Sequence, residues 1–582
     1  MRGLLELGLR TIRSILKTRM IHTRYRARIS ITWLLILLLQ VPAVMARTQA
    51  AIASAHPLAT AAGHEVLAAG GNAFDAAVAV SAALAVVEPA SSGLGGGGFW
   101  LIHRQDGIDL MIDGREKAPQ AASRNMYLDK NGHVIPKLSI NGALAAGIPG
   151  TVAALDFLAT HYGKLPLSQD LAPAIKLARD GFTVGEHYRR LARFRLPVLK
   201  SFPASTHLLD QGNTPGKGFV LKQADLAKTL EVIAKNGAKG FYSGAIAKQL
   251  VDAVRAAGGI WTQDDLRDYT VSIRPPLRGE FQGMRITTGS PPSSGGVGLL
   301  TMLNILAGYD LEKLSASDRA HLIIEAMRRA YRDRAEYLGD PDFVDMPVSL
   351  LINPYYGRGL AQSIRMDRAT PSSSLPGYDI DAQSEAHNTT HLSIIDGDGN
   401  RVSATMSINY PFGSGLVAEG TGVILNDEMD DFSSKPGVPN VYELIGSEAN
   451  AIAPGKRPLS SMSPTVCISD NENSPQKVLA VLGTPGGPTI ITNVFQVLFA
   501  IDRLGISPEL AVSMPKMHHQ CLPDRIDVEK GVPEPTRAAL KVMNHTIATR
   551  NSIGNFQLIS RMYRENWVGI SDPRGSGATM GQ

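Results

Sequence analysis

Residues 389–408 read TTHLSIIDGDGNRVSATMSI, and this stretch decides the fold. Its two ends alternate β-branched or apolar residues with small polar ones, and its middle holds the turn-forming residues Asp, Gly and Asn. Two such runs joined by such a turn predict a β-hairpin. With Asp398 at the centre of a regular turn, paired residue numbers sum to twice 398. Thr389 then lies opposite Ser407, with Cβ atoms about 4.5–5.5 Å apart.

A turn-rich segment, 370–386, precedes the hairpin and contains few large apolar residues. It is the clearest predicted linker in the chain. A cut between this linker and the strand would give Thr389 a free α-amino group, whose pKa of about 7.7–8.0 suits a general base. One residue would then supply both nucleophile and base. Spacing alone leaves the ordinary alternative open, because threonine pairs are common in strands.

The composition is that of a soluble globular protein. Of the 582 residues, 44% are hydrophobic and 19% are charged, which is enough to bury a large core. The length allows up to about four domains, or one large fold. This balance excludes a disordered protein, a collagen, a coiled coil and a multi-span membrane protein. The two cysteines, Cys467 and Cys521, exclude a disulfide scaffold and a four-cysteine zinc site; whether they pair with each other stays open.

The positive charge of the chain is concentrated at its N-terminus. Residues 1–46 contain eight Lys or Arg and one Glu, a net +7, so the remaining residues carry −2 of the total of +5. Nucleic-acid binding needs a basic face on the folded domain. The net charge therefore gives no reason to expect a nucleic-acid partner.

The N-terminus also has the pattern of an export signal. A mainly apolar run, 29–39, follows several arginines and is itself followed by Val-Met-Ala at 44–46. These features predict a secretory signal peptide over 1–46, with Met20 as an alternative start. The rival interpretation is an uncleaved signal anchor, but the run is shorter than the ~20 residues of a membrane span. We expect cleavage and export to the periplasm or the medium.

Two helices have recognisable N-terminal signals. Asn72 can cap a helix over 73–87, and Ser317 can cap a long helix over 318–338. The first is made of alanines and valines, so we expect it to be tightly packed and buried.

Two other patterns favour structural roles. The glycine-rich loop at 91–99 leads into a predicted strand over 99–103 and opens no helix, so it is not a nucleotide-binding fingerprint. Gly295–Gly298 lacks the lysine of a phosphate loop, and close backbone packing is the better interpretation of both. The adjacent His518 and His519 would point to opposite faces of a strand, which favours a structural or surface role over metal binding.

Taken together, several motifs resemble the γ-glutamyltransferase family of N-terminal-nucleophile hydrolases. The resemblance runs from about residue 51 to about residue 574, with the motifs in the family's order. In chain order they are 113–119 (DGREKAP), 291–296 (PPSSGG), 337–343 (YLGDPDF), 388–391 (NTTH), 396–400 (DGDGN), 426–433 (NDEMDDFS), 457–464 (RPLSSMSP) and 483–487 (GTPGG).

The resemblance implies an α+β fold, a four-layer αββα sandwich, made as an inactive precursor that cuts itself before its catalytic threonine. Carried over, the cut falls between Asn388 and Thr389. It yields a large subunit, 47–388, and a small catalytic subunit, 389–582, which stay associated as a heterodimer. The implied activity is that of a γ-glutamyltransferase and glutathione hydrolase. Glutathione and other γ-glutamyl compounds would be donors, water, amino acids or dipeptides would be acceptors, and no cofactor or metal is implied.

The resemblance also assigns roles to residues. Thr389 would attack the γ-glutamyl amide with the help of Ser407, and backbone N–H groups of Gly486 and Gly487 would stabilise the oxyanion. The substrate's α-carboxylate would be bound by Arg115, Ser460 and Ser461. Its α-ammonium group would be bound by Asn409, Glu428 and Asp431.

Two features bear on the type of family member. Ser407 stands where the family usually has threonine; serine keeps the hydroxyl but loses the stiffness of the β-branch. We expect function to be retained, with an altered rate of self-cleavage. The segment 436–447, which contains Tyr442, resembles the lid loop over the γ-glutamyl pocket. It favours the lidded members that use glutathione.

Other interpretations remain for single residues and for the whole chain. Arg115 could form a surface ion pair with Glu116, and Asp427 and Asp430 are expected to be solvated or structural. A related cephalosporin-type acylase should lack the arginine and acidic residues that bind both ends of an amino acid. A non-catalytic exported binding protein should not cut itself.

Overall fold

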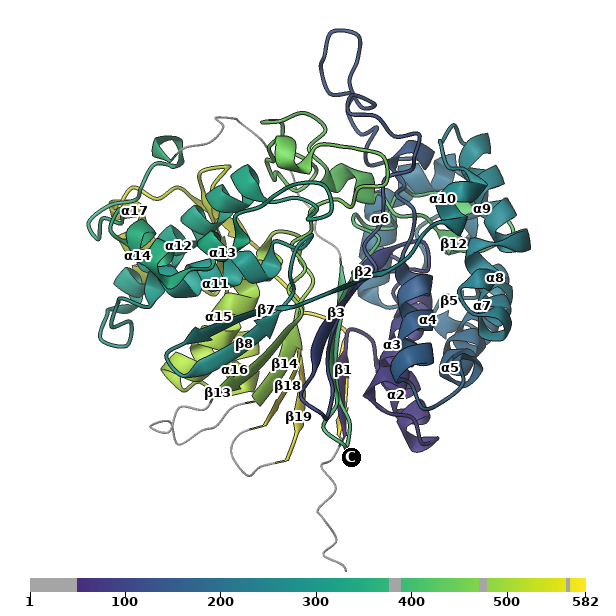
Figure 1. Cartoon of the computed structure of the whole chain (residues 1–582), viewed down its shortest axis with the longest axis horizontal. Coiled ribbons are helices and arrows are strands. Elements are labelled where there is room, and N and C mark those ends of the chain that lie inside the picture. Colours follow the sequence, from purple (N-terminus) through teal and green to yellow (C-terminus); the bar gives the residue numbers. More distant parts are fainter. Residues whose placement is uncertain (1–49, 376–388, 470–478, 562–565, 582) are drawn as a thin grey trace, which may run out of the picture. The chain divides into compact units, whose positions relative to one another are not determined.

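Two β-sheets packed face to face form the core of the computed structural model (Figure 1). The structure describes residues 50–375, 389–469, 479–561 and 566–581. The predicted signal peptide, the second part of the predicted linker and Asn388 lie outside the described residues. Among those described, no helix is both long and apolar enough to cross a membrane.

Both sheets are antiparallel throughout. The first has the order β20 (Ala578–Gly581), β1 (Ala51–Ser54), β9 (Thr390–Ile395), β10 (Arg401–Ser407), β2 (Gly97–His103), β3 (Asp109–Asp113) and β6 (Ser272–Arg274). The second has the order β19 (Val568–Ser571), β18 (Gln557–Arg561), β14 (Leu479–Gly483), β13 (Thr465–Ser469), β8 (Met284–Thr288) and β7 (Leu277–Phe281).

Helices cover the outer face of each sheet, and the αββα sandwich expected from the resemblance is confirmed (Figure 1). On the first sheet lie α2 (Pro57–Ala68), α3 (Ala73–Val87), α4 (Thr151–Tyr162) and α5 (Leu167–Asp180), with α6 (Glu186–Ser201), α7 (Ala224–Asn236), α8 (Lys239–Tyr242), α9 (Gly244–Ala256) and α10 (Gln263–Arg267) beyond them. On the second sheet lie α11 (Gly295–Leu306), α15 (Thr489–Leu504) and α16 (Pro508–Ser513), with α12 (Ala316–Tyr337), α13 (Val348–Leu351), α14 (Pro354–Ala361) and α17 (Glu534–Val542) packed around them.

The predicted hairpin is present as β9 and β10 with the predicted register. Met406 pairs with Thr390, and Arg401 pairs with Ile395, so the residue numbers of each pair sum to twice 398, as predicted. Asp396 holds the turn by accepting hydrogen bonds from the backbone N–H groups of Asp398 and Asn400. The hairpin lies in the middle of the first sheet, between β1 and β2.

The glycine-rich loop before β2 packs against the strand that carries Ser407. A Cβ atom on Gly96 would lie 2.1 Å from the carbonyl oxygen of Ser407, and one on Gly95 would lie 2.1 Å from that of Ile424. Only glycine allows backbones to approach so closely. This confirms close packing as the role of the loop, although the strand begins at Gly97, two residues before the predicted start.

The helix predictions were right in type and close in their bounds. Helix α3 covers the predicted range, is buried along its whole length, and has a reciprocal capping box between Asn72 and Asp75. The predicted cap of α12 was wrong: the hydroxyl of Ser315, not Ser317, accepts the N–H of Asp318 at 3.1 Å. The helix therefore begins two residues earlier.

The first part of the predicted linker is anchored to the body. Ser372 is buried; its N–H donates to Asp524 Oδ2 at 2.7 Å and its hydroxyl donates to the carbonyl of Cys521 at 2.7 Å. These contacts hold a short 3₁₀ turn, Ser372–Ser374, so residues 370–375 are turn-rich as predicted but are anchored to the body.

The remaining sequence patterns are structural. Cys467 and Cys521 are both free and buried, which answers the open question of their pairing. His518 and His519 are buried too, so the surface alternative is wrong for both. The His518 ring hydrogen-bonds the hydroxyl of Thr492 at 2.9 Å.

Candidate active site

A pocket lies at the start of the β9–β10 hairpin and is lined from both halves of the chain. The structure brings every predicted site residue except Gly486 to its wall. The lining residues are Arg115, Thr389, Ser407, Asn409, Glu428, Asp431, Tyr442, Leu444, Ser460, Ser461, Met462, Gly487 and Ile490.

Thr389 and Ser407 meet at one end of the pocket. The Thr389 side chain is almost fully buried, and its Oγ1 lies 3.5 Å from Ser407 Oγ. The hairpin register causes this contact, because the two residues continue the ladder by one pair beyond Thr390 and Met406. The N–H of Asn409 donates to Ser407 Oγ at 2.8 Å, which fixes the serine hydroxyl beside the threonine.

Asn409 follows β10 in a strained backbone conformation that turns the chain along the pocket. Its φ of 71° lies in the left-handed region, where asparagine is tolerated better than most residues. Its side-chain amide donates to the carbonyl of Asp427 at 3.0 Å. Its own carbonyl accepts the hydroxyl of Tyr442 at 2.9 Å. The buried Tyr442 thus ties the predicted lid segment to the wall of the pocket.

Arg115 is a fully buried cation that pairs with two acidic residues of the pocket. Its Nη2 lies 2.5 Å from Asp431 Oδ2, and its Nη1 donates to Glu428 Oε1. Burial raises the pKa values of Glu428 and Asp431, and the guanidinium opposes that rise. The suggested ion pair with Glu116 is present, with charged atoms 3.6 Å apart, but its surface position is wrong because both residues are buried. A positive and a negative subsite therefore lie side by side.

The other two acids of the run are structural, and solvation is excluded because both are buried. Asp430 accepts the hydroxyl of Ser139 at 2.6 Å and the N–H of Val441 at 2.8 Å, which braces the lid segment. Asp427 accepts the N–H of Tyr410 at 2.9 Å. Burial raises the pKa of Asp430 to about 7.

Ser460 and Ser461 lie on an extended segment that is held by the loop between β8 and α11. The N–H of Ser460 donates to the carbonyl of Pro292 at 2.8 Å, and its carbonyl accepts the N–H of Ser294 at 2.8 Å. The Ser460 hydroxyl oxygen accepts the N–H of Met462 at 3.1 Å. The Ser460 hydroxyl therefore has a fixed position in the pocket wall.

Gly486 and Gly487 stand immediately before α15 with φ values of 137° and 53°. A Cβ atom on Gly486 would lie 2.3 Å from Thr489 Oγ1, so glycine is needed there. Within the described residues, neither N–H has a protein acceptor. Unpaired N–H groups at a helix N-terminus favour a negatively charged ligand. Gly487 lines the pocket, whereas Gly486 does not.

Sequence reasoning missed the apolar residues of the pocket. Leu444, Met462 and Ile490 form its apolar lining. Each lies within or next to a motif that had been singled out, so proximity to those motifs was a usable signal. Their nonpolar side chains carried no chemical signal of their own.

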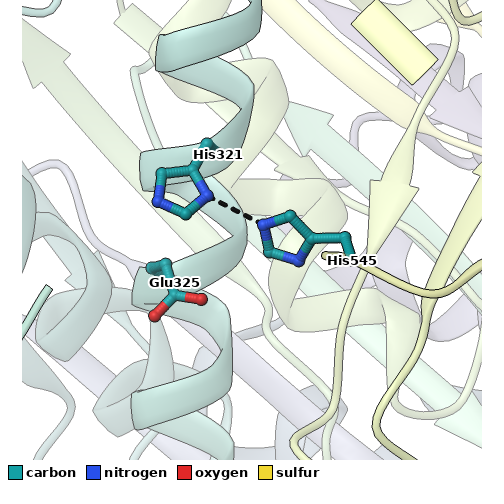
Figure 2. A group of neighbouring side chains, drawn as sticks. All are labelled: His321, Glu325 and His545. Carbon is teal, nitrogen blue, oxygen red and sulfur yellow. Dashed lines mark hydrogen bonds between the residues drawn. The ribbon is translucent and has the colours of Figure 1, made fainter. Parts of the chain in front are cut away.

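A separate buried cluster contains groups that could bind a metal ion, and Figure 2 shows it. His321 Nδ1 and His545 Nε2 share a hydrogen bond of 2.8 Å. The Glu325 carboxylate accepts from Arg329 Nη1 at 2.6 Å and from Arg328 Nε at 3.3 Å. Two guanidinium groups would repel an added cation. Burial, followed by the nearby His321 and Arg328, lowers the pKa of His545 to about 3. The arrangement favours a hydrogen-bonded structural cluster.

Comparison with known proteins gives one consistent family. The model of a family described as gamma-glutamyltranspeptidase matches residues 59–582. The glutathione hydrolase proenzyme of Escherichia coli (strain K12) is 43% identical over 530 residues, which cover 90% of each chain.

Solved structures of a γ-glutamyltranspeptidase and of an acylase are similar to this chain. The cephalosporin acylase from Bacillus halodurans has a TM-score of 0.79 at 28% identity and covers 92% of this chain and 96% of its own. The γ-glutamyltranspeptidase of Helicobacter pylori has a TM-score of 0.54 at 45% identity and covers 55% of this chain and 93% of its own.

Proposed function

The chain belongs to the γ-glutamyltranspeptidase family, and we propose that it is the proenzyme of a glutathione hydrolase and γ-glutamyltransferase. It cleaves the γ-glutamyl bond of glutathione and related amides through an ester on Thr389. The observation that carries the proposal is the shared pocket of Thr389, Arg115, Glu428 and Asp431. That pocket offers a nucleophile next to subsites for both charged ends of an amino acid.

The precursor activates itself by cutting the bond between Asn388 and Thr389. The products are a large subunit, 47–388, and a small subunit, 389–582. The cut leaves Thr389 as an N-terminal residue whose α-amine is the general base for its own hydroxyl. The proenzyme names of the most similar relatives support this step.

Both charged ends of the γ-glutamyl group have partners in the pocket. Its α-carboxylate takes a bidentate position on Arg115 with help from Ser460 and Ser461. Its α-ammonium group is bound by Glu428, Asp431 and the side chain of Asn409. A bound amino acid replaces the present pairs of Arg115 with its own carboxylate, and its ammonium group replaces the guanidinium at the acids, so every buried charge keeps a counter-charge.

Catalysis proceeds in two acyl-transfer steps. The Thr389 oxygen attacks the γ-carbonyl carbon while the α-amine takes the hydroxyl proton, and N–H groups of Gly486 and Gly487 stabilise the oxyanion. The C–N bond breaks, the leaving amine takes up the proton, and a γ-glutamyl ester remains on Thr389. Water then attacks the ester in hydrolysis, and the amine of an amino acid or dipeptide attacks it in transfer.

The place of action is outside the cytoplasm. The leader over 1–46 directs export, and the folded protein works in the periplasm or the medium with small γ-glutamyl compounds as partners. Since the body of the chain carries a net charge of −2, nucleic acid is not among those partners.

The test compares two amides of the same length. The wild-type protein should release the amine from γ-glutamyl-p-nitroanilide and from glutathione, and should act far more slowly on glutaryl-p-nitroanilide, which keeps the terminal carboxylate but lacks the α-ammonium group. Thr389→Ala should remain an uncut precursor without turnover. Preference for the glutaryl amide would favour the acylase alternative. An intact wild-type chain inactive on both amides would favour a binding protein.

A further inference from the structure

Arg334 is a buried cation behind the pocket that contacts no carboxylate directly in the described part of the chain. It lies in the last turn of α12 and is only 5% exposed. Within the described ranges it forms no ion pair with a carboxylate, whereas its neighbour Arg332 pairs with Asp333 at 3.0 Å. Burial lowers the pKa of the Arg334 guanidinium. Such a charge is costly to bury, so its surroundings should show what it is for.

Both polar contacts of its guanidinium lead to the serine pair of the pocket. Nη2 donates to Ser461 Oγ at 3.3 Å. Nε donates to Ser294 Oγ at 2.9 Å, and the Ser294 hydroxyl in turn donates to the carbonyl of Ser460 at 2.7 Å. One side chain thus holds the hydroxyl of Ser461 directly and the backbone of Ser460 through one hydroxyl.

These contacts decide where the serine protons can go. A serine hydroxyl has one proton and accepts through its lone pairs. Ser461 Oγ accepts from Arg334, and Ser460 Oγ accepts from the N–H of Met462. In the described part of the chain neither hydroxyl has an acceptor for its proton. Both protons are therefore available to an anion in the pocket that the two serines line.

The positive charge of Arg334 also acts on Asp431 in the pocket wall. Burial raises the pKa of Asp431, and the positive charges of Arg115 and Arg334 oppose that rise. Two guanidinium groups thus act on the same small volume, one in the pocket wall and one behind the serines. A bound carboxylate would offset both charges.

We propose that Arg334 is a positioning residue of the α-carboxylate subsite, where it orients Ser460 and Ser461 as hydrogen-bond donors and supplies a second positive charge. This inference rests on the proposed function, because it assumes that a γ-glutamyl α-carboxylate occupies the pocket. It predicts that Arg334 contributes to binding the carboxylate and little to the acyl-transfer step at Thr389.

The test separates carboxylate binding from folding and chemistry. Arg334→Met should raise the KM for γ-glutamyl-p-nitroanilide and the Ki of L-glutamate about tenfold or more, as expected for hydrogen bonds to a charged group. Its kcat and its cut before Thr389 should change little. With a substrate whose α-carboxylate is a primary amide, the KM should stay at the wild-type value. Arg332→Met is the matched control and should leave all these values unchanged.

A double-mutant cycle tests the route through the serine. Arg334→Met and Ser461→Ala should be strongly non-additive in KM, because both remove the same donor arrangement. Additive effects, or an equal rise in KM for the carboxylate and amide substrates, would overturn the inference. If Arg334→Met does not mature, Ser294→Ala provides the test instead, because it removes the contact between Arg334 Nε and Ser294 Oγ while Arg334 remains. A carboxylate-specific rise in KM supports the proposal, and an unchanged KM refutes it.

Failure of the inference differs from failure of the proposed function. An Arg334→Met variant with wild-type KM for the carboxylate substrate would overturn the inference alone. A wild-type protein that does not act on γ-glutamyl amides at all would refute both.

Discussion

At the residue scale, Ser407 places a hydroxyl beside the proposed nucleophile, where the resemblance leads us to expect threonine. Ser407 Oγ lies 3.5 Å from Thr389 Oγ1 and is fixed by the N–H of Asn409. The same geometry needs only a hydroxyl, and the methyl group of the family's usual threonine adds stiffness rather than chemistry. Serine can therefore serve here.

Substitution of Ser407 tests this view. Ser407→Ala should slow both self-cleavage and turnover about tenfold, the effect of losing a hydrogen bond worth about 1.4 kcal/mol. Ser407→Thr should process and turn over at least as well as the wild type. The loss of precursor with time, followed by denaturing electrophoresis, together with kcat, measures both effects. Self-cleavage of Ser407→Ala at the wild-type rate would show that the hydroxyl has no such role.

The sequence allowed most of the pocket to be predicted, and one gap has a clear reason. Residues such as Arg115 and Glu428 carry charge inside distinctive motifs, so resemblance placed them, and the structure brings them together. Arg334 lies in a helix that also contains Arg328, Arg329 and Arg332. Sequence does not show which of these arginines is buried without a carboxylate in direct contact. That depends on how α12 packs against the segment that contains Ser461, more than 120 residues further along the chain.

At the scale of elements, the buried side chain of Glu325 holds together a hydrogen-bonded network along α12. Glu325 is fully buried and accepts hydrogen bonds from Arg328, Arg329 and the N–H of Thr370. Burial alone would raise the pKa of this carboxyl, but these partners outweigh it and lower the pKa to about 2. Removing one member of such a buried network leaves unpaired charges.

Glu325 should therefore make stability depend on pH. Because its pKa in the folded state lies below the ordinary glutamate value of 4.5, its stabilising contribution is present above about pH 4.5 and is lost as pH falls towards 2. The shift corresponds to about 3 kcal/mol. Glu325→Gln should lower the melting temperature at pH 7. Between pH 4.5 and pH 2 the melting temperature of this variant should decrease less than that of the wild type, as measured by thermal unfolding.

A surface acid provides the control for this prediction. Glu312 pairs with Arg503 but has half of its side chain exposed, so Glu312→Gln should leave the pH profile of the wild type unchanged. A Glu325→Gln profile identical to that of the wild type would contradict the assigned role.

Elements with strong local signals were predicted best. The turn at Asp398 fixed the hairpin register, and the side chain of Asn72 fixed the start of α3, because both depend on residues close in sequence. The start of α12 was misplaced because two serines, Ser315 and Ser317, were both possible caps. The anchoring of Ser372 depends on Asp524, which local sequence does not reveal.

At the scale of the whole molecule, the proposed subunits are interleaved. In the first sheet, β9 and β10 from the small subunit lie between β1 and β2 from the large one. In the second sheet, β13 of the small subunit pairs with β8 of the large one. Buried pairs such as Arg115 with Glu428 also cross the proposed cut. Separating the fragments would break both sheets, so they should stay together after cleavage.

The resemblance implied the four-layer sandwich, but the order of strands in its sheets was not predicted and could not come from local pattern. Strand β1 pairs with β9 and β20, which lie several hundred residues further along the chain. Alternation along a strand indicates which face is buried but does not identify a distant partner.

The most direct test of the central claim is the state of the purified, exported protein. Denaturing intact-mass analysis with N-terminal sequencing should find two fragments, the smaller of which begins Thr-Thr-His at Thr389. Size-exclusion chromatography without denaturant should show both in one peak. A single uncut chain under conditions that allow maturation, or a smaller fragment that begins at another residue, would contradict the assignment of Thr389 as the N-terminal nucleophile.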